Sequence, residues 1–144
     1  ATLSEHPMIY GTKEASGDIS LIAHAIALCD DDFVFYSGND DQVAAICALG
    51  GKGVISTSAN IAPQKMSALC KACNEGDFSR AAELQLELLP LIDALFAETN
   101  PIPLKAALEL AGICSGKVRL PLTTPSSATI QKLKNVLLQL NILQ

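Results

Sequence analysis

The sequence predicts an α/β fold in which a small parallel sheet of about three strands is followed by a helical region. Short apolar runs alternate with helical patterns over residues 8–56, and predicted strand ends recur about every twenty residues, at Lys13, Ser37 and Ser56. After Ala62 no further strand pattern appears. We therefore expect βα units in the first part of the chain and helices in the rest.

The first βα unit follows from a brief apolar run and a capping residue. We expect a buried strand over residues 8–12, which a turn of small residues follows. The carboxylate of Asp18 can accept hydrogen bonds from the free amides of a first helical turn. Ile19, Ile22 and Ile26 then recur at helical spacing, which predicts a helix that begins at Asp18.

The next two strands are separated by a short helix. Residues 33–37 (FVFYS) form the predicted second strand, and Asp40 or Asp41 can cap the helix after it. The glycine pair at residues 50–51 ends that helix. Residues 53–56 (GVIS) are then the predicted third strand.

The rest of the chain has helical patterns. Pro63 suits the first turn of a helix that Gly76 ends, and Asp77 caps a long helix that runs to Glu98 and is interrupted by Pro90. Further helices are expected over residues 104–110 and 126–140. The long helix carries a stripe of leucines at helical spacing, which predicts a packing face: Leu84, Leu88, Leu91 and Leu95.

Composition excludes several classes of function. The net charge of -5, without a cluster of Lys or Arg, argues against a nucleic-acid-binding surface. No apolar stretch reaches the roughly 18 residues that span a bilayer, and no signal-peptide pattern is present. We therefore expect a cytoplasmic protein that does not contact membranes.

The five cysteines favour reduced thiols over a disulfide framework. Cys70 and Cys73 form a single C-x-x-C pair, which has no second pair or nearby histidine to complete a zinc site. We interpret them as two half-buried cysteines on one helix, and we expect neither a metal nor another cofactor.

A three-stranded parallel sheet is incomplete by itself. Its two edges are unpaired, and such edges favour pairing with another chain. Because 49% of the residues are apolar, the chain is also expected to expose more hydrophobic surface than monomers usually do. These features predict a homo-oligomer or a complex with a complementary chain.

Lys13 is the candidate functional residue, because ligands of α/β folds bind beyond the carboxyl ends of the strands. An amine held in an apolar cavity loses solvation, which favours its neutral and nucleophilic form. Such an amine can form a Schiff base with a ketone. The alternative is a solvated lysine at a strand end, since that position is common for lysine.

Four segments of the chain resemble the carboxyl-terminal half of the dihydrodipicolinate synthase family. They are YGTKEASGD (residues 10–18), YSGNDD (36–41), GGKGVISTSANIAP (50–63) and NPIPLKAALELAG (100–112), in the order and at the approximate spacing of the family. The resemblance implies a TIM (β/α)8 barrel of the pyruvate-dependent class I aldolase superfamily. Residues 1–62 would then supply strands six to eight, and residues 63–144 the last barrel helix and the carboxyl-terminal helical region.

The resemblance also implies a reaction and site residues. Lys13 matches the lysine that condenses with pyruvate, and the resulting enamine would attack aspartate semialdehyde in lysine and diaminopimelate biosynthesis. Ile55 matches the residue whose main-chain carbonyl faces pyruvate, and Gly38 matches the turn glycine that keeps the cavity open. Glu14 should face away from the site, because successive strand residues point to opposite faces.

The resemblance leaves alternatives for the function. Another Schiff-base aldolase or lyase, such as N-acetylneuraminate lyase, uses the same lysine with a different second substrate. The family pattern also begins before Ala1, so we expect a fragment that is inactive without the amino-terminal half of the barrel. A non-catalytic half-barrel that serves assembly, and a domain that senses a keto acid without turnover, are the other interpretations.

Overall fold

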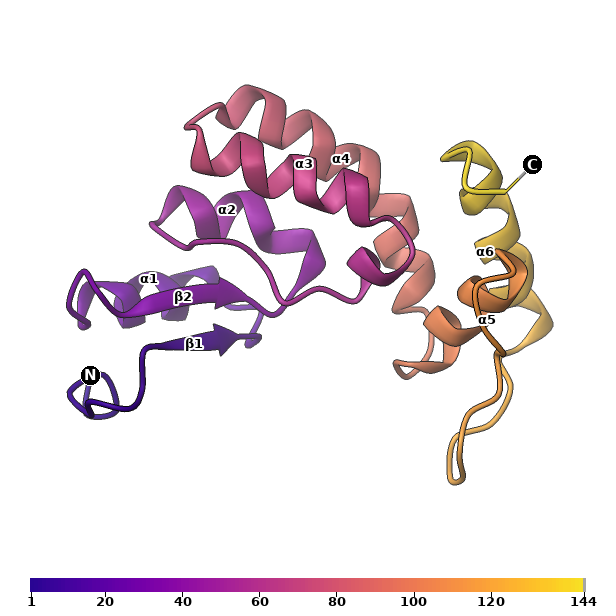
Figure 1. Ribbon diagram of the computed structural model, residues 1–144, viewed down its shortest axis with the longest axis horizontal. Helices are drawn as coiled ribbons and strands as arrows, with labels where there is room; N and C mark the ends of the chain where they lie inside the picture. The colour runs from indigo at the N-terminus through magenta and orange to yellow at the C-terminus, as the bar shows by residue number, and fades with distance from the viewer. Residues whose placement is uncertain (144) are drawn as a thin grey trace. The chain divides into compact units, whose positions relative to one another are not determined.

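The computed structural model describes residues 1–143, which form two compact units. The first unit contains Ala1–Ser56 and Ser67–Leu86, and the second contains Thr57–Met66 and the chain from Glu87 onward. Figure 1 shows the strands at the amino-terminal end of the chain and only helices and loops beyond them. This order agrees with the predicted α/β class.

The sheet has two parallel strands, β1 (Gly11–Glu14) and β2 (Val34–Ser37), in the register that pairs Lys13 with Tyr36. The first strand was predicted over residues 8–12, so that prediction was wrong by about three residues. It was also wrong about burial, since Met8 and Tyr10 are 73% and 72% exposed. The second strand is confirmed.

The predicted third strand is present only as a parallel bridge between Ser37 and Val54. The amide of Ser37 donates to the carbonyl oxygen of Gly53 at 2.8 Å, and the amide of Ile55 donates to that of Ser37 at 2.9 Å. These bonds follow the pattern of a parallel ladder. The segment therefore lies beside β2, but it is too short to count as a third full strand.

Helices cover one face of this sheet. Helix α1 (Ile19–Ala27) begins as predicted, with Asp18 Oδ1 accepting the amide of Leu21 at 3.0 Å. A 3-10 turn, η1 (Asp40–Gln42), and α2 (Val43–Ala48) follow β2. Their N-cap residues are Asn39 and Gln42, so the prediction that Asp40 or Asp41 caps this helix was wrong.

The core of the first unit lies between the strands and these helices. Helix α2 packs against both β2 and α1. The side chains of Ile22, Val43 and Ile46 are completely buried there, and Phe35 of β2 is 5% exposed. On the other face of β2, Tyr36 remains 38% exposed. Among the residues that the structure describes, helices therefore cover one face of the sheet and leave the other face open.

Helices α3 (Pro63–Asn74) and α4 (Phe78–Leu95) are separated at the predicted glycine and capping residue. Gly76 lies between them with φ +77°, and Asp77 Oδ1 accepts the amide of Arg80 at 2.9 Å. The predicted leucine stripe of α4 is buried, which confirms it as a packing face: Leu84, Leu88, Leu91 and Leu95. However, α4 continues through Pro90 and ends at Leu95, three residues earlier than expected.

The second unit contains the 3-10 turn η2 (Ser58–Asn60), α5 (Ile102–Leu110) and α6 (Ser127–Gln139). Helix α5 contacts both α6 and η2, and its contact with α6 buries Ala107, Leu133 and Leu137 completely. Ser126 caps α6 by accepting the amide of Thr129 at 3.2 Å. Both predicted helices are confirmed to within two residues.

Within residues 1–143, no helix is both long enough and apolar enough to cross a membrane.

Candidate functional site

Lys13 lies near the carboxyl end of β1, directly opposite Tyr36 of β2. Both side chains are exposed, whereas their neighbours Phe35 and Ser37 are buried. Since side chains alternate along a strand, Lys13 and Tyr36 project from the face of the sheet that carries no helices. The prediction that Lys13 stands at a strand tip is confirmed, although its side chain is not enclosed by the described residues.

A shallow depression of about 310 Å³ surrounds this lysine. Its lining includes Lys13 and Val34 from the two strands, together with Tyr36 and Ile55. Ile55 is 52% exposed and is held in place through its amide, which bonds to Ser37. The structure therefore brings two of the three predicted site residues into one hollow.

Gly38, the third predicted residue, directly follows β2 and does not line this hollow. A Cβ atom at Gly38 would stand 2.5 Å from Ala15 Cβ and 3.0 Å from Lys13 Cε. The Gly38 amide donates to the carbonyl oxygen of Glu14 at 2.6 Å, which draws the two strand ends together. A glycine is therefore required here for close approach of the chain to the lysine.

Comparisons with known proteins show the family of the chain. The model of the dihydrodipicolinate synthetase family matches residues 1–140. A 4-hydroxy-tetrahydrodipicolinate synthase of Archaeoglobus fulgidus is 48% identical over 98% of this chain and 49% of its own length. The chain belongs to the dihydrodipicolinate synthetase family.

Solved structures of this family have the same fold. A dihydrodipicolinate synthase from Thermotoga maritima superposes with a TM-score of 0.95 at 40% identity, over 97% of this chain and 48% of that one. A chloride-inhibited synthase from Acinetobacter baumannii, complexed with pyruvate, gives 0.94 at 36% identity, over 99% of this chain and 49% of that one.

The chain spans about half the length of the relatives that it matches. Its fold is the carboxyl-terminal part of a TIM (β/α)8 barrel followed by a helical tail, which confirms the predicted fold class. In such a barrel the face of the strands opposite the helices points inward. The division of the barrel at residue 62 stays a prediction.

Glu14 lies on the other face of β1 from Lys13, as the alternation of strand residues predicts. Its Oε1 accepts the amide of Ser16 at 2.6 Å. This bond fixes the turn after β1 and gives the carboxylate a structural role. Ser37 has a similar role, because its buried hydroxyl donates to the carbonyl oxygen of Asn39 at 2.7 Å.

Tyr36 is the residue of this hollow that sequence reasoning missed. Its phenol ring lies next to the strand position of Lys13 and close to Gly53, where an added Cβ would be 3.8 Å from the ring. The signal in the sequence was the alignment of two strand ends, KE and YS, in one register. That alignment becomes informative only when the pairing of the strands is known.

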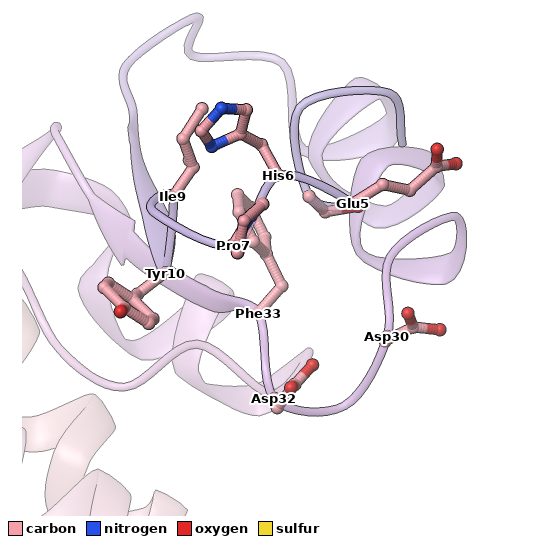
Figure 2. Close-up of a pocket in the computed structure, with 9 residues that line it drawn as sticks. Glu5, His6, Pro7, Ile9, Tyr10, Asp30, Asp32 and Phe33 are labelled. Atoms are coloured by element: carbon pink, nitrogen blue, oxygen red, sulfur yellow. The ribbon is translucent and has the colours of Figure 1, made fainter.

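A second hollow, of about 300 Å³, lies at the amino ends of the strands (Figure 2). His6, Pro7 and Phe33 line it, and Figure 2 shows the carboxylates of Glu5 and Asp30 directed away from these three side chains. Members of the barrel class react at the opposite ends of the strands. Within residues 1–143, no group of three potential metal ligands is close enough to hold an ion.

Three thiols of the first unit, those of Cys47, Cys70 and Cys73, are structural groups. Cys70 and Cys73 lie on α3, half-buried and buried, which confirms the interpretation of the C-x-x-C pair. Burial, and then the neighbouring Cys73, raise the pKa of the Cys47 thiol to about 12. Burial is also the main cause of the raised pKa values of Cys70 and Cys73. All three therefore stay protonated at neutral pH, which disfavours nucleophilic chemistry.

Proposed function

We propose that the chain supplies the Schiff-base lysine of a dihydrodipicolinate synthase, and that Lys13 is this residue. The observation that carries the proposal is the position of Lys13 at the carboxyl end of β1, in a hollow with Tyr36 and Ile55. Catalytic residues of TIM barrels lie at this end of the strands. The pyruvate complex of the Acinetobacter baumannii relative supports pyruvate as the first substrate.

In the proposed reaction, the amine of Lys13 attacks the keto carbon of pyruvate. The carbinolamine then loses water and leaves a protonated imine between Lys13 and the substrate. The imine withdraws electrons from the pyruvate methyl group, which loses a proton to give an enamine. The enamine carbon forms a bond with the aldehyde carbon of aspartate semialdehyde, and this product leads to lysine and diaminopimelate in the cytoplasm.

Two other residues support this chemistry through the backbone. The lack of a side chain at Gly38 leaves room for the Lys13 stem, whose Cε would otherwise be 3.0 Å from a Cβ. Ile55 would turn its carbonyl oxygen toward pyruvate. Its amide is bonded to Ser37, which fixes the orientation of this segment beside Lys13.

We further propose that the face around Lys13 is closed by the amino-terminal half of a barrel. Lys13, Tyr10 and Ile55 are exposed in this structure, and β1 has a neighbouring strand on one side only among residues 1–143. A catalytic amine needs exclusion from water. The isolated chain would therefore be inactive, and the complete barrel would assemble further into an oligomer.

Trapping with borohydride tests the proposed role of Lys13. The chain is incubated with pyruvate and borohydride, with and without the amino-terminal half of a family member, and peptides are mapped by mass spectrometry. We expect a reduced pyruvate adduct on Lys13 in the complemented sample and none on Lys52, an exposed lysine of the same unit. Lys13→Gln should abolish labelling, and an unlabelled Lys13 in the complemented wild type would refute the proposal.

The second substrate is tested in the same complemented sample. Product formation is compared between aspartate semialdehyde and N-acetylmannosamine, the aldehyde partner of N-acetylneuraminate lyase chemistry. We expect turnover with aspartate semialdehyde. Turnover with the sugar alone would retain the Schiff base but assign the chain to the lyase alternative.

A further inference from the structure

The second unit contains a groove that is distant in sequence from Lys13. The loop that joins α5 and α6 extends away from both helices and is orange in Figure 1. The returning part of this loop, residues 117–122, and the first turn of α5 line an open groove of about 360 Å³. The lining is mainly apolar and includes Val118, Leu120 and Leu122 with two prolines.

Three cations line this apolar groove: Lys105 from α5, and Lys117 and Arg119 from the loop. None of them lies within ion-pair distance of a carboxylate among residues 1–143, where the three ion pairs involve other residues. Lys105 Nζ donates to the thiol of Cys114, at 3.4 Å. Positive charge thus gathers on a chain whose net charge is -5.

The groove is held in shape by bonds on its outer side. Glu109 is the acidic residue nearest in sequence to Lys105. Its Oε1 accepts the amide of Gly116 at 2.9 Å, so this carboxylate is bonded to the loop. The amide of Leu122 donates to the carbonyl oxygen of Arg119 at 3.0 Å. Leu120 nevertheless remains 86% exposed, which is costly for a leucine without a contact partner.

We propose that this groove binds a small organic anion with an apolar body, of the class of aliphatic or aromatic monocarboxylates. The apolar lining would take the body, and the cations from α5 and from the loop would hold the carboxylate. The volume lies near the lower end of about 300–1,000 Å³ that is usual for small-molecule sites. This size favours a small molecule over an acidic peptide segment, and the site does not depend on Lys13.

Octanoate is the first probe, because it combines one carboxylate with an apolar chain. We expect titration of the ¹⁵N-labelled chain to shift the amide signals of Val118, Leu120 and Leu122 at low salt. Octanol, which lacks the charge, should bind about tenfold more weakly, and octylamine should not bind there. Equal binding of all three probes, or shifts confined to other residues, would overturn the proposal.

Variants without the charges distinguish octanoate binding at this site from nonspecific binding of octanoate to apolar surface. Replacing Lys105, Lys117 and Arg119 together by Gln should weaken octanoate binding about tenfold, and salt should weaken the wild type alone. Lys134→Gln, an exposed change on α6, is the matched control and should have no effect. Retained affinity in the triple variant would refute the site.

Two further arms test other occupants. A short acidic peptide with apolar residues that displaces octanoate and binds more tightly would assign the groove to protein recognition instead. The titration is repeated after addition of the amino-terminal half of a family member. Octanoate binding that persists supports the proposal, whereas its loss would identify the groove as part of the contact between halves.

Discussion

Gly38 is a predicted site residue that has little room for a side chain. It follows β2 directly, and a Cβ would approach Ala15, Glu14 and Lys13 at 2.5, 3.0 and 3.0 Å. Its φ angle lies outside the left-handed region, so these contacts alone determine the effect of a larger residue. The Lys13 stem is one of the groups that would have to move.

We expect Gly38→Ala to destabilise the chain by about 1–3 kcal/mol, as overpacking usually does, and to displace Lys13. Urea unfolding measures the first effect, and borohydride trapping in the complemented sample measures the second. Ala15→Gly supplies the matched control, because it removes the closest contact. In the Ala15→Gly background the same substitution should cost roughly 1 kcal/mol less, and strictly additive effects would contradict this explanation.

Lys13 and Tyr36 show what a sequence reveals about single residues of a site. Lys13 was predictable because an apolar run that ends in a lysine places the amine at a strand tip. Tyr36 was not, because its relation to Lys13 depends on the register between β1 and β2. The exposure of Lys13 was also not predictable from local sequence, since the enclosure of a side chain depends on which elements pack over the sheet face.

Elements with strong local signals were predicted well. Asp18 and Asp77 cap α1 and α4 through side-chain hydrogen bonds, as predicted from their position before helical patterns. Ser126 caps α6 in the same way, although only the helix itself was predicted there. Strands fared worse, because strand bounds depend on pairing with other strands. The third strand is reduced to one bridge at Val54, where only β2 is available as a neighbour among residues 1–143.

Helix α6 is anchored at its start by a carboxylate from outside the helix. Glu98 Oε1 accepts the Thr129 hydroxyl at 2.6 Å and the Ser126 amide at 3.0 Å. The hydrogen bond from Thr129, followed by those from Ser126, lowers the pKa of Glu98 below its ordinary value. These hydrogen bonds therefore favour the ionised form of the carboxylate in the folded state.

We expect Glu98→Gln to lower the free energy of unfolding at pH 7 and to have a smaller effect in acid. A carboxylate with a lowered pKa stabilises the fold above its unfolded pKa, near 4.3, and this contribution disappears as pH falls through the folded pKa. Urea unfolding at pH 7 and pH 3 measures the change. With Thr129→Val as the background, the substitution should matter less at pH 7, and an effect that is equal at both pH values would contradict this assignment.

At the scale of the whole molecule, the main feature is a sheet face without a cover. Three large side chains line the hollow on this face and remain exposed: Tyr10 (72%), Tyr36 (38%) and Ile55 (52%). The apolar excess of the composition already predicted such surface. What composition could not reveal is its location, which follows from the helices lying on one side of β1 and β2.

If this face is the inner wall of a barrel, the amino-terminal half should protect β1 from hydrogen exchange. Alone, β1 pairs with β2 and has no other strand beside it among residues 1–143, so its outward amides should exchange quickly. Complementation should slow them by roughly tenfold or more, because new ladder bonds must open first. Amides within α5, which are already bonded inside their helix, provide the internal control and should change little. A complex that forms while β1 keeps its rapid exchange would show that the halves associate elsewhere, and the inner-wall assignment of the face around Lys13 would fail with it.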